Sequence, residues 1–179
     1  MMATLALVHA YARQTLRSVP GQAPVEAFSA RLQALSTAHT ALLQQRWAEA
    51  RMSDVVKGAL GTLEGNERFD MEGPSIRLGA RATLSLSLLL HELSTNALKY
   101  GALSRPGGRV AVSWNIADGL LMLRWREIGG PAVRPPTRKG FGSRLINMGI
   151  VGTGGVELRY PSTGFEADFS ASLSQVQHQ

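Results

Sequence analysis

Residues 91–103 read HELSTNALKYGAL, and this stretch decides the fold. It follows an apolar run and predicts the second half of a long helix that spans about residues 80–100. Glu92 and Asn96 are four residues apart and Lys99 follows three residues later, so the three side chains share one helix face. A carboxylate, an amide oxygen and an ammonium on one face could orient an attacking group, hold Mg²⁺ and neutralise phosphate charge. The stretch predicts a metal–nucleotide site, although a buried helix with a solvated polar stripe fits it equally well in isolation.

Two glycine-containing stretches follow this helix. Residues 125–131 read WREIGGP, and residues 139–146 read KGFGSRLI. Gly140 and Gly142 would let the backbone approach a ligand closely. Ser143 and the first amides of a following helix would offer hydrogen-bond donors to an anion. Taken singly, each glycine pair is more often a turn.

The order of these three motifs resembles the N box and the two glycine boxes of the ATP-binding domain of sensor histidine kinases. More narrowly, His91 with Trp125 and Glu127 is similar to the signature of the HWE histidine kinases, and the resemblance covers nearly the whole chain. It implies the Bergerat-type fold, which is the two-layer α/β sandwich of histidine kinases and GHKL ATPases. It also implies that ATP and Mg²⁺ are the cofactors.

The resemblance implies a role for each matching residue. Asn96 would bind the Mg²⁺ that bridges the phosphates, and Glu92 would act as the base or orient the acceptor imidazole. His91 would help to hold the site rather than accept phosphate. Glu127 would accept a hydrogen bond from the adenine amine. The other contacts expected with ATP come from Lys99, Tyr100, Gly129, Gly140, Phe141, Gly142 and Ser143.

The N-terminal part of the chain predicts a helical hairpin. Residues 3–17 are rich in helix formers, and a second helix is predicted over residues 24–51. Its apolar positions step by three and four, which is a heptad seam. The seam comprises Val25, Phe28, Leu32, Leu35, His39 and Leu42. Because a hairpin this small cannot bury the seam alone, we expect a homodimer that forms a four-helix bundle.

We therefore expect two domains. Residues 1–51 would form the dimerisation and histidine-phosphotransfer hairpin, and residues 52–179 the catalytic ATP-binding domain. The resemblance places the phosphate-accepting histidine of the family just before Met1, so no histidine of the chain occupies that position. His9 would lie about 80° away from the expected helix face. We expect the chain to be a piece of a longer sensor kinase, and a homologue without the acceptor is the alternative.

The remaining pattern mixes helices and strands, with Asp118-Gly119 as a strong hairpin signal. Residues 174–179, which include His178, read as a polar tail. The expected fold class is α+β, with the helical hairpin followed by the two-layer α/β sandwich. The expected elements after residue 52 are a helix over 53–63, a strand over 75–78, the long helix, strands over 109–116 and 120–127, a helix from about 141, and strands over 156–160 and 165–173.

Composition narrows the function classes. The chain has 19 Lys and Arg residues against 13 Asp and Glu, and the basic residues are dispersed, so nucleic acid is not an expected partner. The absence of cysteine excludes disulfides and thiolate metal sites and agrees with a cytoplasmic location. The longest apolar run, around residues 84–90, is interrupted by Ser85 and Ser87 and is too short to span a bilayer.

The leading interpretation is the kinase core of a two-component sensor kinase. It would transfer the γ-phosphoryl group of ATP to a histidine of the hairpin, from which an aspartate of a response-regulator receiver domain takes it. The implied partners are a second copy of the chain, a receiver domain and an upstream sensory domain. Three alternatives stay open: a degenerate docking module that binds receivers without ATP turnover, a serine kinase of the anti-sigma-factor type, and a helical dimer with an inert α/β domain.

Overall fold

The computed structural model describes residues 22–44, 50–61, 66–137 and 140–178. The described strands form a five-stranded sheet in the order β2-β4-β5-β7-β6 and a separate two-stranded pair, β1-β3. The pairing is antiparallel throughout the large sheet except between β2 and β4, which run parallel. The strands are β1 (Ala50–Arg51), β2 (Phe69–Glu72), β3 (Arg77–Leu78), β4 (Arg109–Ala117), β5 (Leu120–Ile128), β6 (Val156–Arg159) and β7 (Glu166–Ser172).

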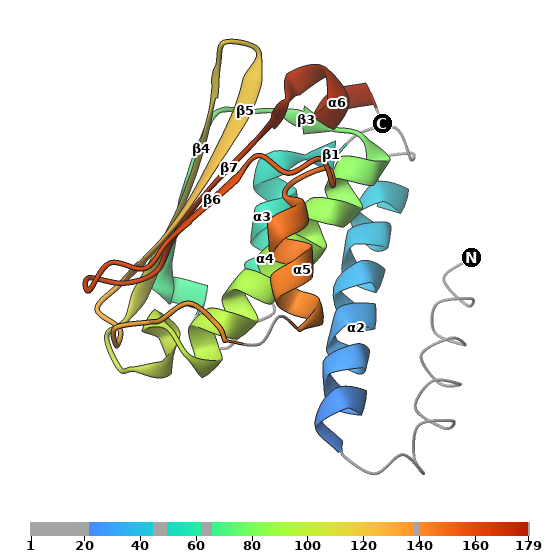
Figure 1. The fold of residues 1–179 in the computed structure, drawn as a ribbon. Coiled ribbons are helices and arrows are strands. Elements are labelled where there is room, and N and C mark those ends of the chain that lie inside the picture. Colours follow the sequence, from blue (N-terminus) through green and yellow to red (C-terminus); the bar gives the residue numbers. More distant parts are fainter. Residues whose placement is uncertain (1–21, 45–49, 62–65, 138–139, 179) are drawn as a thin grey trace.

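Helices cover one face of the large sheet (Figure 1). The helix α4 (Ala80–Lys99) packs with α3 (Met52–Leu60) and α5 (Phe141–Met148) between the sheet and α2 (Gln22–Gln44), which forms an outer helix on the far side. A short C-terminal helix, α6 (Leu173–His178), packs near β3 and the start of α4. This arrangement confirms the predicted two-layer α/β sandwich.

The core lies between the sheet and the α3–α5 layer, because the strands alternate buried and solvent-facing side chains. In β5, Leu121, Leu123 and Trp125 are buried against the helices, whereas Arg124 and Arg126 point to the other face. Each fully buried side chain of this kind stabilises the fold by roughly 1.5–3 kcal/mol. The β4–β5 hairpin closes through Asp118 and Gly119, whose φ angles of 51° and 74° confirm the predicted tight turn.

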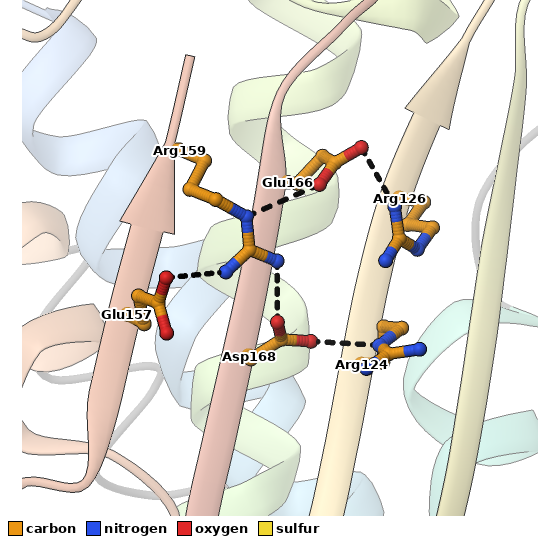
Figure 2. Close-up of polar contacts among 6 residues, drawn as sticks. All are labelled: Arg124, Arg126, Glu157, Arg159, Glu166 and Asp168. Carbon is orange, nitrogen blue, oxygen red and sulfur yellow. Dashed lines mark hydrogen bonds and ion pairs between the residues drawn. The ribbon is translucent and has the colours of Figure 1, made fainter. Parts of the chain in front are cut away.

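The face of the sheet opposite the helices carries a ladder of ion pairs (Figure 2). Arg159 on β6 donates to Asp168 and Glu166 on β7 and pairs with Glu157 on its own strand. Arg124 and Arg126 on β5 bond the same two β7 carboxylates from the other side, at 2.9 Å and 2.7 Å. The charged outer face follows directly from the strand alternation.

Several sequence expectations differ from the structure. The helix predicted over residues 24–51 is described only as far as Gln44, and its last two residues are wrong because Ala50 and Arg51 form β1 and pair with Leu78 and Arg77. The predicted helical hairpin cannot be compared in full, because residues 3–17 lie outside the described part of the chain.

The polar tail predicted over residues 174–179 is also wrong for residues 174–178, because they belong to α6, which buries Val176 completely while Ser174 and His178 are exposed. The strand β2 was missed, since only Phe69 of its four residues is buried and the pattern lacks an apolar alternation. Of the predicted heptad seam, Leu32 is buried within this chain, whereas Phe28 is 42% exposed. No helix among the described residues has both the length and the hydropathy needed to cross a bilayer.

Candidate nucleotide site

The helix α4 carries the site residues predicted from residues 91–103. Three buried residues of this helix, Thr83, Ser87 and Ser94, donate hydrogen bonds from their hydroxyl groups to backbone carbonyls one turn earlier. Their polar groups therefore have hydrogen-bond partners inside the core. The helix ends where the amides of Tyr100 and Gly101 donate to the carbonyls of Asn96 and Ala97. The apolar face of α4 therefore sits on the sheet, and its last turns carry the polar motif.

Glu92 lies at the junction of α4, α5 and α2. Its side chain is only 5% exposed and receives two hydrogen bonds from the guanidinium of Arg31, which is on α2. The backbone of Gly142 is so close that a Cβ there would overlap the Oε2 atom of Glu92. Phe141, the first residue of α5, places its ring 4.7 Å from the guanidinium carbon of Arg31. The N-box carboxylate and the second glycine box are therefore adjacent.

Glu127 lies beyond the other end of the motif, at the close of β5. Its Oε2 atom accepts a hydrogen bond of 2.7 Å from the backbone N–H of Ala102, and its Oε1 atom accepts one of 3.2 Å from the indole N–H of Trp125. The residue is 5% exposed. Burial raises the pKa of the Glu127 carboxyl, and the two hydrogen bonds offset part of that effect.

Asn96 sits on α4 between these two clusters. Its side chain is half-buried, and no hydrogen bond to its amide group is found within the described residues. Lys99 is exposed, and Tyr100 is 64% exposed, so both are accessible to a ligand. No group of three or more His, Asp or Glu side chains gathers as a metal site in the described part of the chain. An amide oxygen supplemented by the phosphates of a nucleotide fits Mg²⁺, which binds few protein ligands.

The start of α5 presents backbone to this region. Gly140 precedes the helix and is exposed, and a Cβ there would meet nothing within 4 Å. The hydroxyl of Ser143 donates to the carbonyl of Gly140 at 2.9 Å, which leaves its oxygen able to accept rather than donate. Gly129, which follows β5, has a φ of 74° and turns the chain away from the sheet.

His91 is half-buried next to Glu92. Burial lowers the pKa of its imidazole, the charge of Glu92 raises it, and the charge of Arg31 adds to the lowering. The neutral form is therefore favoured near neutral pH.

The structure brings the predicted residues into two groups rather than one. Glu92, Phe141 and Gly142 meet directly, and Glu127 meets the end of α4 through Ala102, whereas α4 itself links the two groups. Sequence reasoning missed Arg31, because it lies 61 residues from Glu92 and no motif contains it. It also missed the Trp125–Glu127 hydrogen bond, although both residues belong to the quoted signature.

The fold class is that of histidine kinase ATP-binding domains. The structure matches the histidine kinase domain of the blue-light-activated histidine kinase EL346 from Erythrobacter litoralis with a TM-score of 0.69 and 19% identity, covering 99% of this chain and 87% of that one. The Acinetobacter baumannii histidine kinase AdeS matches with a TM-score of 0.56 and 15% identity, over 96% of each chain. At these identities the likeness shows the fold alone.

The family model described as HWE histidine kinase matches residues 2–75. A blue-light-activated histidine kinase of Brucella anthropi is 42% identical over 156 residues, which are 83% of this chain and 32% of that protein. The chain belongs to the HWE histidine kinase family. It spans about a third of the length of the curated relatives it matches.

Proposed function

We propose that the chain is the kinase core of a two-component sensor histidine kinase, which binds Mg²⁺-ATP along the last turns of α4. The observation that carries this proposal is the position of Asn96. Its amide is half-buried between the Glu92–Gly142 contact on one side and the Glu127–Ala102 hydrogen bond on the other. All three family motifs thus converge on one helix, and membership of a histidine kinase family supports the assignment.

Each residue has a task that follows from its place. The Asn96 amide oxygen would bind the Mg²⁺ that accompanies the phosphates, and that ion supplies neutralisation of phosphate charge. Backbone amides at the start of α5, beside Gly142, would donate to phosphate oxygens. Glu127 keeps lone pairs beyond those used by Ala102 and Trp125, and one of these would accept from the adenine amine. Tyr100 and Phe141 offer exposed rings for packing.

Phosphoryl transfer would take place at a histidine supplied by the helical hairpin. Glu92 would take the proton of the attacking imidazole as the new N–P bond forms and the bond from the γ-phosphorus to the ADP oxygen breaks. We assign residues 1–51 to the hairpin and residues 52–179 to the ATP-binding domain. The partners would be a second copy of the chain, a receiver domain that takes the phosphoryl group and an upstream sensory domain. Its need for ATP agrees with a cytoplasmic location.

Substitution of Asn96 tests this proposal. Asn96→Ala removes the amide oxygen and should weaken Mg²⁺-dependent ATP binding at least tenfold, which is about 1.4 kcal/mol. Titration calorimetry with ATP, with and without Mg²⁺, measures the change, and circular dichroism reports whether the fold is kept. Asn115→Ala, at an exposed position of β4, is the matched control. Equal affinity in Asn96→Ala and the unchanged protein would refute the nucleotide site.

A further inference from the structure

Arg31 makes a contact that none of the kinase motifs accounts for. Its Nε atom lies 2.5 Å from the Oε1 atom of Glu92 and its Nη2 atom lies 3.0 Å from Oε2, so one guanidinium engages both carboxylate oxygens. The Glu92 side chain is 5% exposed, which makes it the least exposed carboxylate among the ion pairs found in the described residues. A two-point pair of this kind is stronger and more directional than a single contact.

Two residues at the start of α5, Phe141 and Gly142, also lie next to the Arg31 guanidinium. It stacks over the ring of Phe141 at the start of α5. The missing Cβ of Gly142 leaves the space in which the Glu92 carboxylate sits, and a Cβ there would also lie 3.9 Å from the Nη2 atom of Arg31. The outer helix α2, the motif helix α4 and the helix α5 are therefore joined through one side chain. The three helices are labelled in Figure 1.

This pairing has a consequence for the role proposed for Glu92. A general base needs a free lone pair within reach of the proton that it takes. Each oxygen of Glu92 keeps a lone pair besides the one that Arg31 uses, but only 5% of the side chain is exposed and the backbone of Gly142 lies against Oε2, so an acceptor has little access to those lone pairs.

We propose that Arg31 is an internal latch that holds α2 on α4 and α5 and keeps Glu92 from acting as the base. Release of the latch requires α2 to shift away from α4, which frees the carboxylate and separates Arg31 from Phe141. The inhibitory part of this proposal rests on the proposed role of Glu92, whereas the holding part rests on geometry alone. The two parts are tested by different measurements.

The holding part is tested by distance measurements that need no nucleotide. Because the chain has no cysteine, Gln33→Cys on α2 and Asn115→Cys on β4 provide two unique spin-label sites, both at exposed positions. Pulsed electron spin resonance on labelled protein diluted with unlabelled protein should give one main distance within the chain in the otherwise unchanged protein. Arg31→Gln should reduce the population at that distance by at least half, and Arg31→Lys, which keeps the charge but loses the two-point fork, should reduce it less.

The control for this measurement is Arg109→Gln. Arg109 makes a two-point pair with Asp70 at the surface, so its loss removes the same kind of interaction without touching α2. Its distance distribution should match that of the unchanged protein. A distribution in Arg31→Gln that is indistinguishable from the Arg109→Gln control would overturn the latch.

The inhibitory part is tested by phosphate release from Mg²⁺-ATP, a reaction in which water replaces the acceptor imidazole and Glu92 would take the proton of that water. Arg31→Gln should raise kcat at least threefold, because release of the latch frees Glu92. The gain should vanish when Glu92→Gln is added. A fall in kcat, or a gain that survives Glu92→Gln, would overturn the inhibitory role. If no variant releases phosphate above background while the distance change is present, the holding role stands and the proposed role of Glu92 fails.

Discussion

The carboxylate of Glu127 shows how one residue can connect two distant motifs. It accepts hydrogen bonds from the Trp125 indole and from the Ala102 amide, so it joins the end of β5 to the turn after α4. The glycine at position 101 makes this approach possible, because a Cβ there would overlap the Glu127 Oε2 atom. This glycine is required by packing rather than by its backbone angles, since its φ is −109°.

A substitution at this position should be costly. Gly101→Ala should destabilise the fold by roughly 2–4 kcal/mol, because it adds overpacking and disturbs two buried hydrogen bonds. Urea unfolding measures the change in the free energy of unfolding. Gly58→Ala is the matched control, since Gly58 lies inside α3 and its added Cβ would meet only a Thr37 methyl at 3.9 Å. The control should be neutral or slightly stabilising. Equal stability of the two variants would contradict the tight approach.

At the scale of elements, the outer face of the sheet is held by the ladder centred on Arg159 (Figure 2). Burial raises the pKa of Asp168, but hydrogen bonds from Arg159 and Arg124 outweigh it, and the net pKa lies below its usual value of 3.8. A lowered pKa in the folded state means that the carboxylate stabilises the fold above pH 3.8, and that this stability is lost as the pH falls below that value.

Removal of Arg159 should therefore change the acid sensitivity of the fold. In Arg159→Ala, Asp168 loses the larger of the two hydrogen-bond contributions that lower its pKa. The pKa of Asp168 in the folded state therefore rises toward its value in the unfolded state. The loss of unfolding free energy between pH 7 and pH 3 should be smaller than in the unchanged protein. Denaturant unfolding at both pH values measures it, with Arg105→Ala, at an exposed position, as the control. An unchanged acid sensitivity would show that Arg159 does not lower the pKa of Asp168 in the folded protein.

At the scale of the whole molecule, one side of α2 packs against the chain's own helices and the other side is exposed. Leu32 is buried against the chain's own helices, and Arg31 beside it reaches Glu92, whereas Phe28 is 42% exposed. The predicted heptad seam is thus only partly covered within one chain. The exposed remainder agrees with the proposed homodimer, in which a second copy would cover it.

The dimer is tested by light scattering over a concentration series. The chain should dimerise, and Leu35→Asp should raise the dissociation constant at least tenfold, because a charge would replace apolar surface in the seam. Gln33→Asp, on the exposed side of the same helix, should leave the dissociation constant unchanged. A monomer at every concentration, unaffected by Leu35→Asp, would show that one chain covers the seam by itself.

Local physical chemistry explains which parts of the fold could be predicted. The helix α4 was predicted nearly to its ends, because its 3.6-residue periodicity is strong and Tyr100-Gly101 follows it. The β4–β5 hairpin was predicted because Asp118 and Gly119 accept positive φ. By contrast, α6 was missed, since six residues with one buried side chain carry almost no periodic signal.

The sequence by itself determined the order of the motifs, the helix that bears Asn96 and the family to which the chain is similar, because each depends on residues that are close together in the chain. Only the tertiary structure decided which residues that are far apart in the sequence come into contact. The parallel pairing of β2 with β4 and the contact of Arg31 with Glu92 join segments that are tens of residues apart. Such contacts arise from the packing of whole elements, and no local pattern of residues encodes them.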